Sequence, residues 1–256
     1  MSAVHPSAPV IDPVAWPVPA PRVLVRYGID GDLRFISHHD EIRMLTRAIV
    51  RAGWPLAYSG GFNPAPRLAI LLPRPVGMAA RNQLALVRVI TDVVPGALAT
   101  ALVEALPRQF LLEDVATVPP GVAPRPRTTT YELAVAPDDR AALPDRIASF
   151  LARGDWRVDR VDRDGHRRGW VDIRPAVREV ELDESTLRVT LDLEAGVSAR
   201  PEELLAALGL PGEAYGHRWV RARVLWNIQS AGAPRHAAPN SEEVRSDLDK
   251  QVQQED

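Results

Sequence analysis

One order of secondary-structure elements occurs twice along the chain, once on either side of a proline-rich stretch. Alternating, β-branched segments predict strands, and segments with an apolar period near 3.6 residues predict helices. In both halves the predicted order is strand, helix, strand, strand, helix, strand, with an extra short strand in the first half. That order is typical of a ferredoxin-like sandwich. We therefore expect an α+β fold made of two tandem ferredoxin-like units.

The composition around these patterned halves predicts the domain boundaries. Prolines crowd the stretch PPGVAPRPR, which predicts a linker at residues 119–127. The two units then span residues 22–118 and 128–228. The ends of the chain are polar or proline-rich and have no apolar period, so we expect a disordered arm at 1–21 and a disordered tail at 229–256.

Several predicted elements rest on short stretches of sequence. LRFI at residues 33–36 is expected to extend the first strand, and PLAYS at 55–59 to form a short strand of its own. A capped apolar period predicts a helix from His38 to about Ala52. In the second half, WRVDRVD at 156–162 predicts the second strand, and GWVDIRPAVREVEL at 169–182 predicts one arm of a hairpin.

The absence of cysteine restricts the chemistry that this chain can perform. None of the 256 residues is cysteine, which excludes disulfides, a cysteine-ligated zinc site, a cysteine-bound iron–sulfur cluster and a cysteine nucleophile. The histidines are scattered, and the side chains of adjacent His38 and His39 diverge by about 100° on a helix. We therefore predict neither a metal nor another cofactor. The chain has no apolar run of about 20 residues and no secretory signal pattern, so a cytoplasmic, membrane-free location is expected.

Charge is distributed unevenly along the chain. The formal net charge is -2, but residues 22–127 contain 13 arginines against 8 acidic residues. Lys250 is the only lysine, and arginine forks suit phosphate better than lysine does. The first half is therefore the better candidate for contact with an anionic partner.

The helix expected from His38 has recognisable start and stop signals. Ser37 fits an N-cap, and Asp40 stands three residues later, where its carboxylate also suits the positive end of the helix dipole. Gly53 suits the position just after the last turn. Structural roles alone explain these three residues.

Three arginines form a row on the side of this helix opposite its apolar stripe. Arg43, Arg47 and Arg51 recur every four residues, which places them about 6 Å apart within a narrow arc. One interpretation is a solvated helix face. The other is a recognition surface, because forked cations at this spacing match successive phosphates or an acidic protein partner.

The stretch YSGGFNPAP, residues 58–66, follows this helix. It predicts either a tight, well-specified loop or a binding loop in which Tyr58 and Phe62 stack on bases while glycine amides meet phosphate. Arg67, Arg74 and Arg81 follow and could extend the same surface. The candidate anion- or RNA-binding residues are Arg43, Arg47, Arg51, Tyr58, Ser59, Gly61, Phe62, Asn63 and Arg67. The residues assigned structural roles are Ser37, Asp40, Gly53, Pro64 and Gly77.

These motifs resemble the bacterial radical SAM-linked protein family, over roughly residues 22–226. The matching positions are Phe35, Ser37, His38, Asp40, Arg43, Arg47, Arg51, Tyr58, Ser59, Gly61, Phe62, Asn63, Pro64, Pro66 and Gly77. Two departures stand out: His39 replaces an apolar residue, and the family's acidic residues after the position of Gly77 are replaced by Arg81, Asn82 and Gln83. The resemblance implies association with radical SAM enzymes and RNA-related genes. It implies no reaction.

Three functions remain open from the sequence. The favoured one is a non-catalytic module that binds RNA, such as tRNA or rRNA, or presents it to a radical SAM modification enzyme. The second is a protein-interaction module that docks a radical SAM partner through the same arginines. The third is a metal-independent ribonuclease that uses His38 with Tyr58 as general acid and base. The chain lacks the cysteines of a radical SAM centre, so it cannot perform that chemistry itself.

Overall fold

The computed structural model describes residues 21–119, 122–161, 164 and 166–228. Apart from residue 21, the predicted disordered arm and tail lie outside these residues. Among the described helices, none has both the length and the apolar character needed to cross a membrane.

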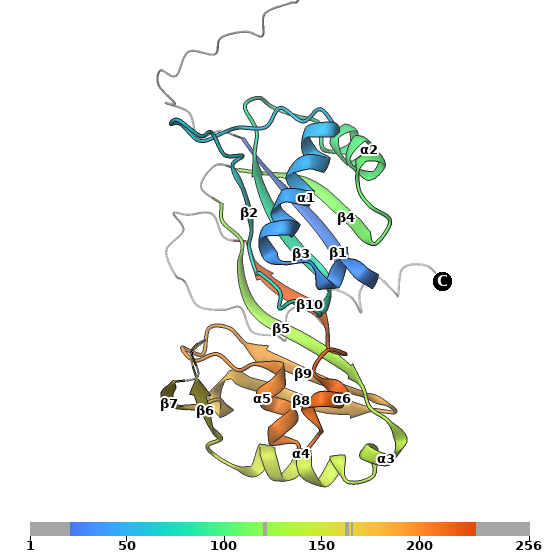
Figure 1. Cartoon of the computed structure of the whole chain (residues 1–256), viewed down its shortest axis with the longest axis vertical. Coiled ribbons are helices and arrows are strands. Elements are labelled where there is room, and N and C mark those ends of the chain that lie inside the picture. Colours follow the sequence, from blue (N-terminus) through green and yellow to red (C-terminus); the bar gives the residue numbers. More distant parts are fainter. Residues whose placement is uncertain (1–20, 120–121, 162–163, 165, 229–256) are drawn as a thin grey trace, which may run out of the picture.

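In the first half, the elements follow the order strand, helix, strand, strand, helix, strand, as predicted. The strands lie in the order β4-β1-β3, with β2 also paired to β3, and each of these pairs is antiparallel. Helices α1 and α2 cover one face of these strands (Figure 1). The elements are β1 (Arg22–Ile29), α1 (His38–Arg51), β2 (Leu68–Ile70), β3 (Ala79–Arg88), α2 (Pro95–Ala105) and β4 (Phe110–Val118).

The second half has the strand order β10-β5-β9-β8, again with antiparallel neighbours. A separate two-stranded ribbon, β6–β7, is inserted between α4 and β8. The elements are β5 (Arg125–Ala134), α3 (Pro137–Arg140), α4 (Leu143–Ala152), β6 (Arg157–Val161), β7 (Arg167–Asp172), β8 (Val177–Asp183), β9 (Thr186–Asp192), α5 (Pro201–Ala207), α6 (Gly212–Tyr215) and β10 (Val220–Asn227).

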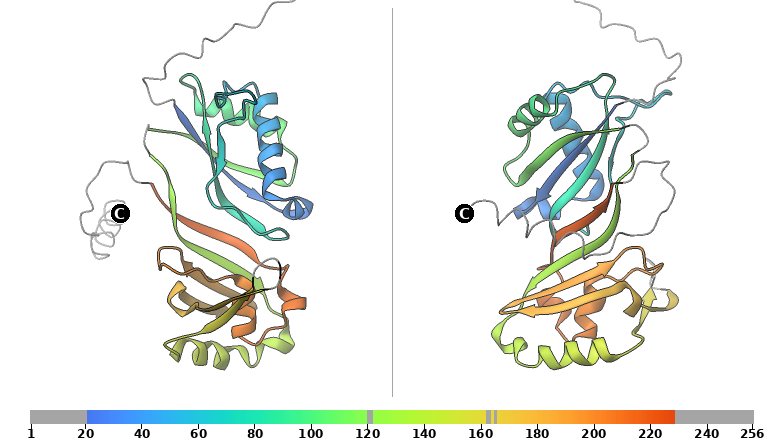
Figure 2. Two further views of the ribbon diagram at one scale, coloured as in Figure 1. Left: turned by 60° about the vertical axis from the view of Figure 1, so that its left-hand side comes forward. Right: turned by 180° about the vertical axis from the view of Figure 1, so that it is seen from behind.

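The two halves share one sheet. Strand β10 runs parallel to β3 and pairs with it at Val220–Ala79 and Arg221–Ala80, which joins the strands of both halves into an eight-stranded mixed sheet within the described residues. Seen from behind, the strands face the viewer and the helices of both halves lie on the far side (Figure 2). The fold is therefore α+β as predicted, but two separate ferredoxin-like units in tandem are not confirmed. Strand β5 begins at Arg125, so the predicted linker runs into the sheet.

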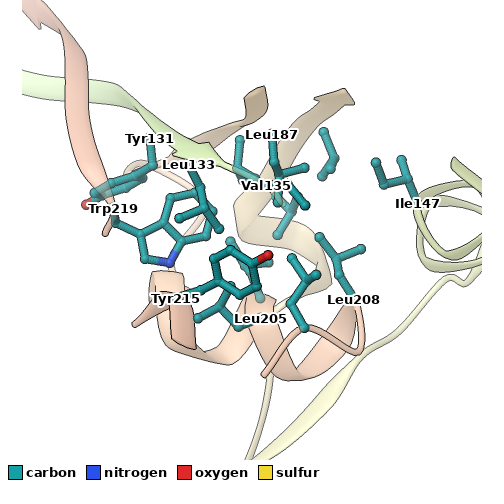
Figure 3. Close-up of a cluster of buried hydrophobic side chains, with 14 of the residues drawn as sticks. Tyr131, Leu133, Val135, Ile147, Leu187, Leu205, Leu208, Tyr215 and Trp219 are labelled. Carbon is teal, nitrogen blue, oxygen red and sulfur yellow. The ribbon is translucent and has the colours of Figure 1, made fainter. Parts of the chain in front are cut away.

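Each half has its own apolar core on the helix side of the sheet. In the first half, Tyr27 stacks on Phe110 with ring centroids 4.5 Å apart, beneath the buried side chains of α1. In the second half, Tyr131 meets Trp219 edge to face at 6.3 Å (Figure 3). Met78 belongs to the first half but is buried in this second core. The halves are thus joined by side-chain packing as well as by the sheet.

Two predicted strands of the first half differ from the structure. Residues 33–36 do not extend β1, because the chain forms a 3₁₀ turn at Gly31–Phe35 in which the Ile36 N–H donates to the Leu33 carbonyl. Residues 55–59 form no strand, and only isolated bridges join Leu56 to Val89 and Tyr58 to Pro66.

The second half departs further from the prediction. The stretch at 156–162 does not enter the main sheet: its strand, β6, pairs with β7. The stretch at 169–182 is not one strand, because a 3₁₀ turn at Arg174–Ala176 separates β7 from β8. Pro175 lies in that turn, and a proline cannot donate to a strand ladder.

Candidate functional site

Helix α1 is fixed at its start by the Ser37 side chain. The Asp40 N–H donates to Ser37 Oγ at 3.2 Å, and the Ser37 hydroxyl donates back to Asp40 Oδ2 at 2.7 Å. After the helix, Gly53 adopts φ of +70°, a left-handed conformation that glycine tolerates at a helix end. Ser37, Asp40 and Gly53 therefore set where α1 begins and ends.

The Ser37 hydroxyl is also the main reason that the pKa of Asp40 lies below its usual value, with Arg43 adding to the effect. A carboxyl whose pKa falls on folding contributes stability above its unfolded pKa, and this contribution is lost as pH falls through the folded pKa. We expect Ser37→Ala to raise the pKa of Asp40, measured by the pH dependence of its side-chain carbon shift in NMR. Ser149→Ala, on α4, should leave that pKa unchanged.

The three arginines of α1 are exposed but are not equivalent. Arg43 Nη1 lies 3.4 Å from Asp40 Oδ1, an exposed pair of small energetic value. Arg51 Nη2 donates to the Ala105 carbonyl, 2.5 Å away at the end of α2. Arg47 forms no ion pair with any described residue. Arg51 therefore also joins the two helices, and Arg47 is the least engaged of the three.

A groove of about 780 Å³ lies along the outer side of α1 and the end of α2. Arg47 and Arg51 line it together with Glu104, and much of its remaining lining is apolar, including Met44 and Val50. The two cations exceed the single carboxylate, so the groove suits an anionic ligand that also offers apolar surface.

The loop at residues 58–66 is pinned at its base. The Ala65 N–H donates to Ser59 Oγ at 2.9 Å, and the Ser59 N–H donates to the Ala65 carbonyl at 2.8 Å. Gly61 has φ of +110°, a conformation that L side chains rarely adopt. At the tip Phe62 is completely exposed, and Asn63 and Pro64 next to it are exposed as well.

Two further side chains flank this loop. Tyr58 is 46% exposed, and its carbonyl accepts from Arg67 Nε at 3.4 Å. The loop and the C-terminal end of α1 lie at the same end of the first half (Figure 1). The loop projects on the side of α1 where β2 lies, and α2 lies on the opposite side of α1. The two exposed aromatic rings and Arg67 thus lie at the same end of the first half as the end of α1, but on the opposite side of α1 from the groove lined by Arg47 and Arg51.

His38 and Tyr58 are not brought together. His38 begins α1, whose 14 residues span about 21 Å, and Tyr58 follows the other end of that helix. Hydrogen bonds to the two ends of β3 show the same separation. The Arg34 carbonyl, just before α1, accepts from the Gly77 N–H, which lies just before β3. The Ala57 N–H, next to Tyr58, donates to the carbonyl of Arg88 at the other end of β3. Two groups so far apart cannot act as acid and base on one scissile bond, which requires hydrogen-bond reach.

A buried ionic network, which was not predicted from the sequence, lies beneath the start of α1. Arg74 Nε is 3.1 Å from Glu41 Oε2, and both side chains are only 2% exposed. The Tyr27 hydroxyl donates to Glu41 Oε1 at 2.7 Å, and burial, aided by the Glu41 charge, raises the pKa of Tyr27 well above its usual value. Arg74 also donates to the carbonyls of Leu33, Arg34, Ile36, Pro75 and Met78. Arg74 therefore does not extend the anion-binding surface.

Gly77 lies between Arg74 and β3, next to the buried network. It has φ of +89°, and a Cβ at that position would lie 3.8 Å from the Phe35 ring. Its N–H donates to the Arg34 carbonyl at 2.8 Å, so it holds the 3₁₀ turn against the loop that carries Arg74. The left-handed backbone explains why glycine stands here, because a Cβ 3.8 Å from the ring would make only an ordinary contact.

Residues 22–204 match the model of a family described as an uncharacterized protein conserved in bacteria (DUF2344). The chain belongs to this family. The DUF2344 match begins at the first residue of β1 and ends within α5, so it includes α1, the 58–66 loop and the buried network. No curated protein matches the chain.

Within the described part of this DUF2344 chain, no group of three or more His, Asp or Glu side chains is placed to hold a metal ion. Partly buried His38 presents its Nδ1 atom without a hydrogen-bond partner among the described residues. The candidate site therefore comprises the arginine-bearing outer face of α1 and the exposed aromatic loop at residues 58–66, and a buried salt bridge anchors the start of α1.

Proposed function

We propose that this protein is a non-catalytic RNA-binding module that presents RNA to a radical SAM modification enzyme. The observation that carries the proposal is the pinned loop at residues 58–66, which exposes Phe62 completely and Tyr58 by almost half, at the end of the first half where α1 also ends. An aromatic ring exposed on a loop that is already fixed by hydrogen bonds is available to stack on a base.

The contacts expected with RNA follow from these groups. Arg47 and Arg51 would meet phosphates through charge-assisted hydrogen bonds, and Phe62 and Tyr58 would stack on unpaired bases, a contact worth about 1–3 kcal/mol per base. Because the two Ser59–Ala65 hydrogen bonds already fix the loop, little further ordering is needed when RNA binds.

The layout of the sheet agrees with a recognition module. We propose that the orders β4-β1-β3-β2 and β10-β5-β9-β8 are two ferredoxin-like units that share one sheet, with the β6–β7 ribbon as an insertion in the second; the antiparallel pairing within each order supports this. Because this chain contains no cysteine, an iron–sulfur cluster would have to belong to the partner enzyme. We place such a partner and its RNA in the cytoplasm.

Arg47→Glu and Phe62→Ala test the proposal. With a fluorescent single-stranded RNA at low salt, each change should weaken retention on a filter by about tenfold or more. Arg47→Glu should also reduce the slope of log affinity against log salt. Arg108→Glu and Trp170→Ala are the matched controls, because both side chains are exposed and lie outside the proposed surface. Unchanged retention in both test variants would contradict RNA binding at this surface.

The apolar part of the groove lining favours a second candidate function. Met44, Val50 and Leu106 next to Arg47 and Arg51 would also suit an acidic amphipathic segment of a radical SAM protein. Affinity capture from a bacterial lysate treated with nuclease separates the two functions. Recovery of a radical SAM protein by the wild type, and its loss with Arg47→Glu, would favour protein docking over RNA binding.

A further inference from the structure

A second cleft lies on the face of the sheet that the helices leave open. It has a volume of about 640 Å³ and is lined by side chains of β3, β5, β8, β9 and β10. Two of the β5 residues that line it, Thr130 and Glu132, alternate along the strand with Tyr131 and Leu133 of the second core, so this open-face cleft lies on the side of the sheet opposite that core. Its volume lies in the range of small-molecule sites, about 300–1,000 Å³.

The centre of the cleft is a row of polar side chains in register across four strands. Glu179 on β8 pairs with Thr190 on β9, Thr190 pairs with Thr130 on β5, and Thr130 pairs with Arg223 on β10. The two threonine hydroxyls are 3.1 Å apart and hydrogen-bond to each other. The row therefore presents a carboxylate, two hydroxyls and a guanidinium to whatever enters the cleft.

Most of the positive charge in the cleft has no counter-ion within the described part of the chain. Arg188 is neutralised, because it lies 3.3 Å from Glu132 and 3.7 Å from both Glu181 and Asp183. Arg81, Arg178 and Arg223 line the same cleft and form no ion pair with a described residue. Three guanidinium groups without an ion pair to a described residue, against the single carboxylate of Glu179 in the same state, leave the cleft with an excess of positive charge that favours an anion.

The rim of the cleft beside β10 is held in a strained conformation. Asn82 has φ of +57°, which is uncommon for a residue with a side chain. Its N–H donates to Glu113 Oε1 at 3.0 Å, and its carbonyl accepts from Trp226 Nε1 at 3.1 Å. Neighbouring elements thus fix the backbone that carries Arg81, and backbone strain held in this way clusters at ligand sites.

We infer that the open-face cleft binds a small phosphate monoester that carries hydroxyl groups. The arginines supply the contacts to phosphate, and Glu179 and the two threonines supply partners for hydroxyls. Among the described residues, none that lines the cleft is aromatic, so this lining offers no stacking surface of the kind that single-stranded nucleic acid requires. This site does not depend on the RNA-binding surface of α1.

Isothermal titration calorimetry of the full chain with ribose 5-phosphate tests the inference, with ribose as the uncharged counterpart. We expect saturable binding of ribose 5-phosphate, at least tenfold tighter than binding of ribose, and at least tenfold weaker binding in Arg178→Gln and in Arg223→Gln. Arg108→Gln is the matched control, since its exposed side chain lies outside the cleft.

Each outcome either supports or overturns phosphate binding in the open-face cleft. Binding that is lost only in the cleft variants supports the site, and equal loss in Arg108→Gln would mean unspecific charge attraction and overturn it. No binding of ribose 5-phosphate by the wild type, or equal binding of ribose, would also overturn it. Because Arg47→Glu alters only the α1 surface, a failure of RNA binding is distinguishable from a failure here.

Discussion

Replacing Glu41 by alanine is expected to lower the free energy of unfolding by about 3–5 kcal/mol, because it leaves a buried guanidinium without its counter-ion. The Arg74 side chain has no access to water to compensate, being 2% exposed. The Tyr27 hydroxyl would lose its acceptor at the same time. Only the five backbone carbonyls would still hold Arg74 in place.

Equilibrium unfolding in urea, followed by far-UV circular dichroism, measures this change. Arg43→Ala is the matched control: it removes an arginine–carboxylate pair from the same helix, but an exposed one, so its effect should stay below about 1 kcal/mol. Glu41→Gln should lie between the two, because an amide can still accept from Tyr27. If Glu41→Ala were no more destabilising than Arg43→Ala, the buried pair would not hold α1 to the sheet.

The elements that sequence alone predicted well are those with purely local signals. Helix α1 begins at His38 as expected because Ser37 caps it, and Gly53 follows its last turn as predicted. The shared sheet could not be predicted, since only two residue pairs, Val220–Ala79 and Arg221–Ala80, join β10 to β3. No periodicity within one segment indicates which distant strand it will meet.

The same contrast between local and distant signals applies to the candidate site. The exposed row on α1 follows from helical spacing, whereas the role of Arg74 depends on Glu41, 33 positions earlier in the chain. One signal was nonetheless present: Glu41 stands four residues before Leu45, on the apolar side of the helix. A carboxylate at a core position requires a buried partner. The sequence therefore implied that an arginine elsewhere in the chain pairs with Glu41, but it did not indicate which arginine.

Replacing Arg221 by methionine should lower stability by about 3 kcal/mol and loosen the joint between the two halves. Arg221, only 1% exposed, lies on β10, yet its partners belong to the first half: it donates to the carbonyls of Leu72 and Pro73 at 2.7 and 3.2 Å and to the Gln83 side chain. Burial lowers the pKa of Arg221, as expected for a cation removed from water. Methionine fills similar volume but leaves these acceptors without a donor, and that loss is the source of the cost.

Hydrogen exchange with mass spectrometry distinguishes a loosened joint from uniform destabilisation. In Arg221→Met, amides of β3 near Ala79 and of the loop at residues 71–78 should exchange faster than those at the centre of β9, because Met78 and the short ladder to β10 depend on this contact. Arg223→Met, an exposed change two residues along the same strand, should leave both regions as in the wild type. Equal acceleration in β3 and β9 would show that the halves unfold as one unit regardless of Arg221, and that Met78 packing and the shared sheet alone provide the coupling.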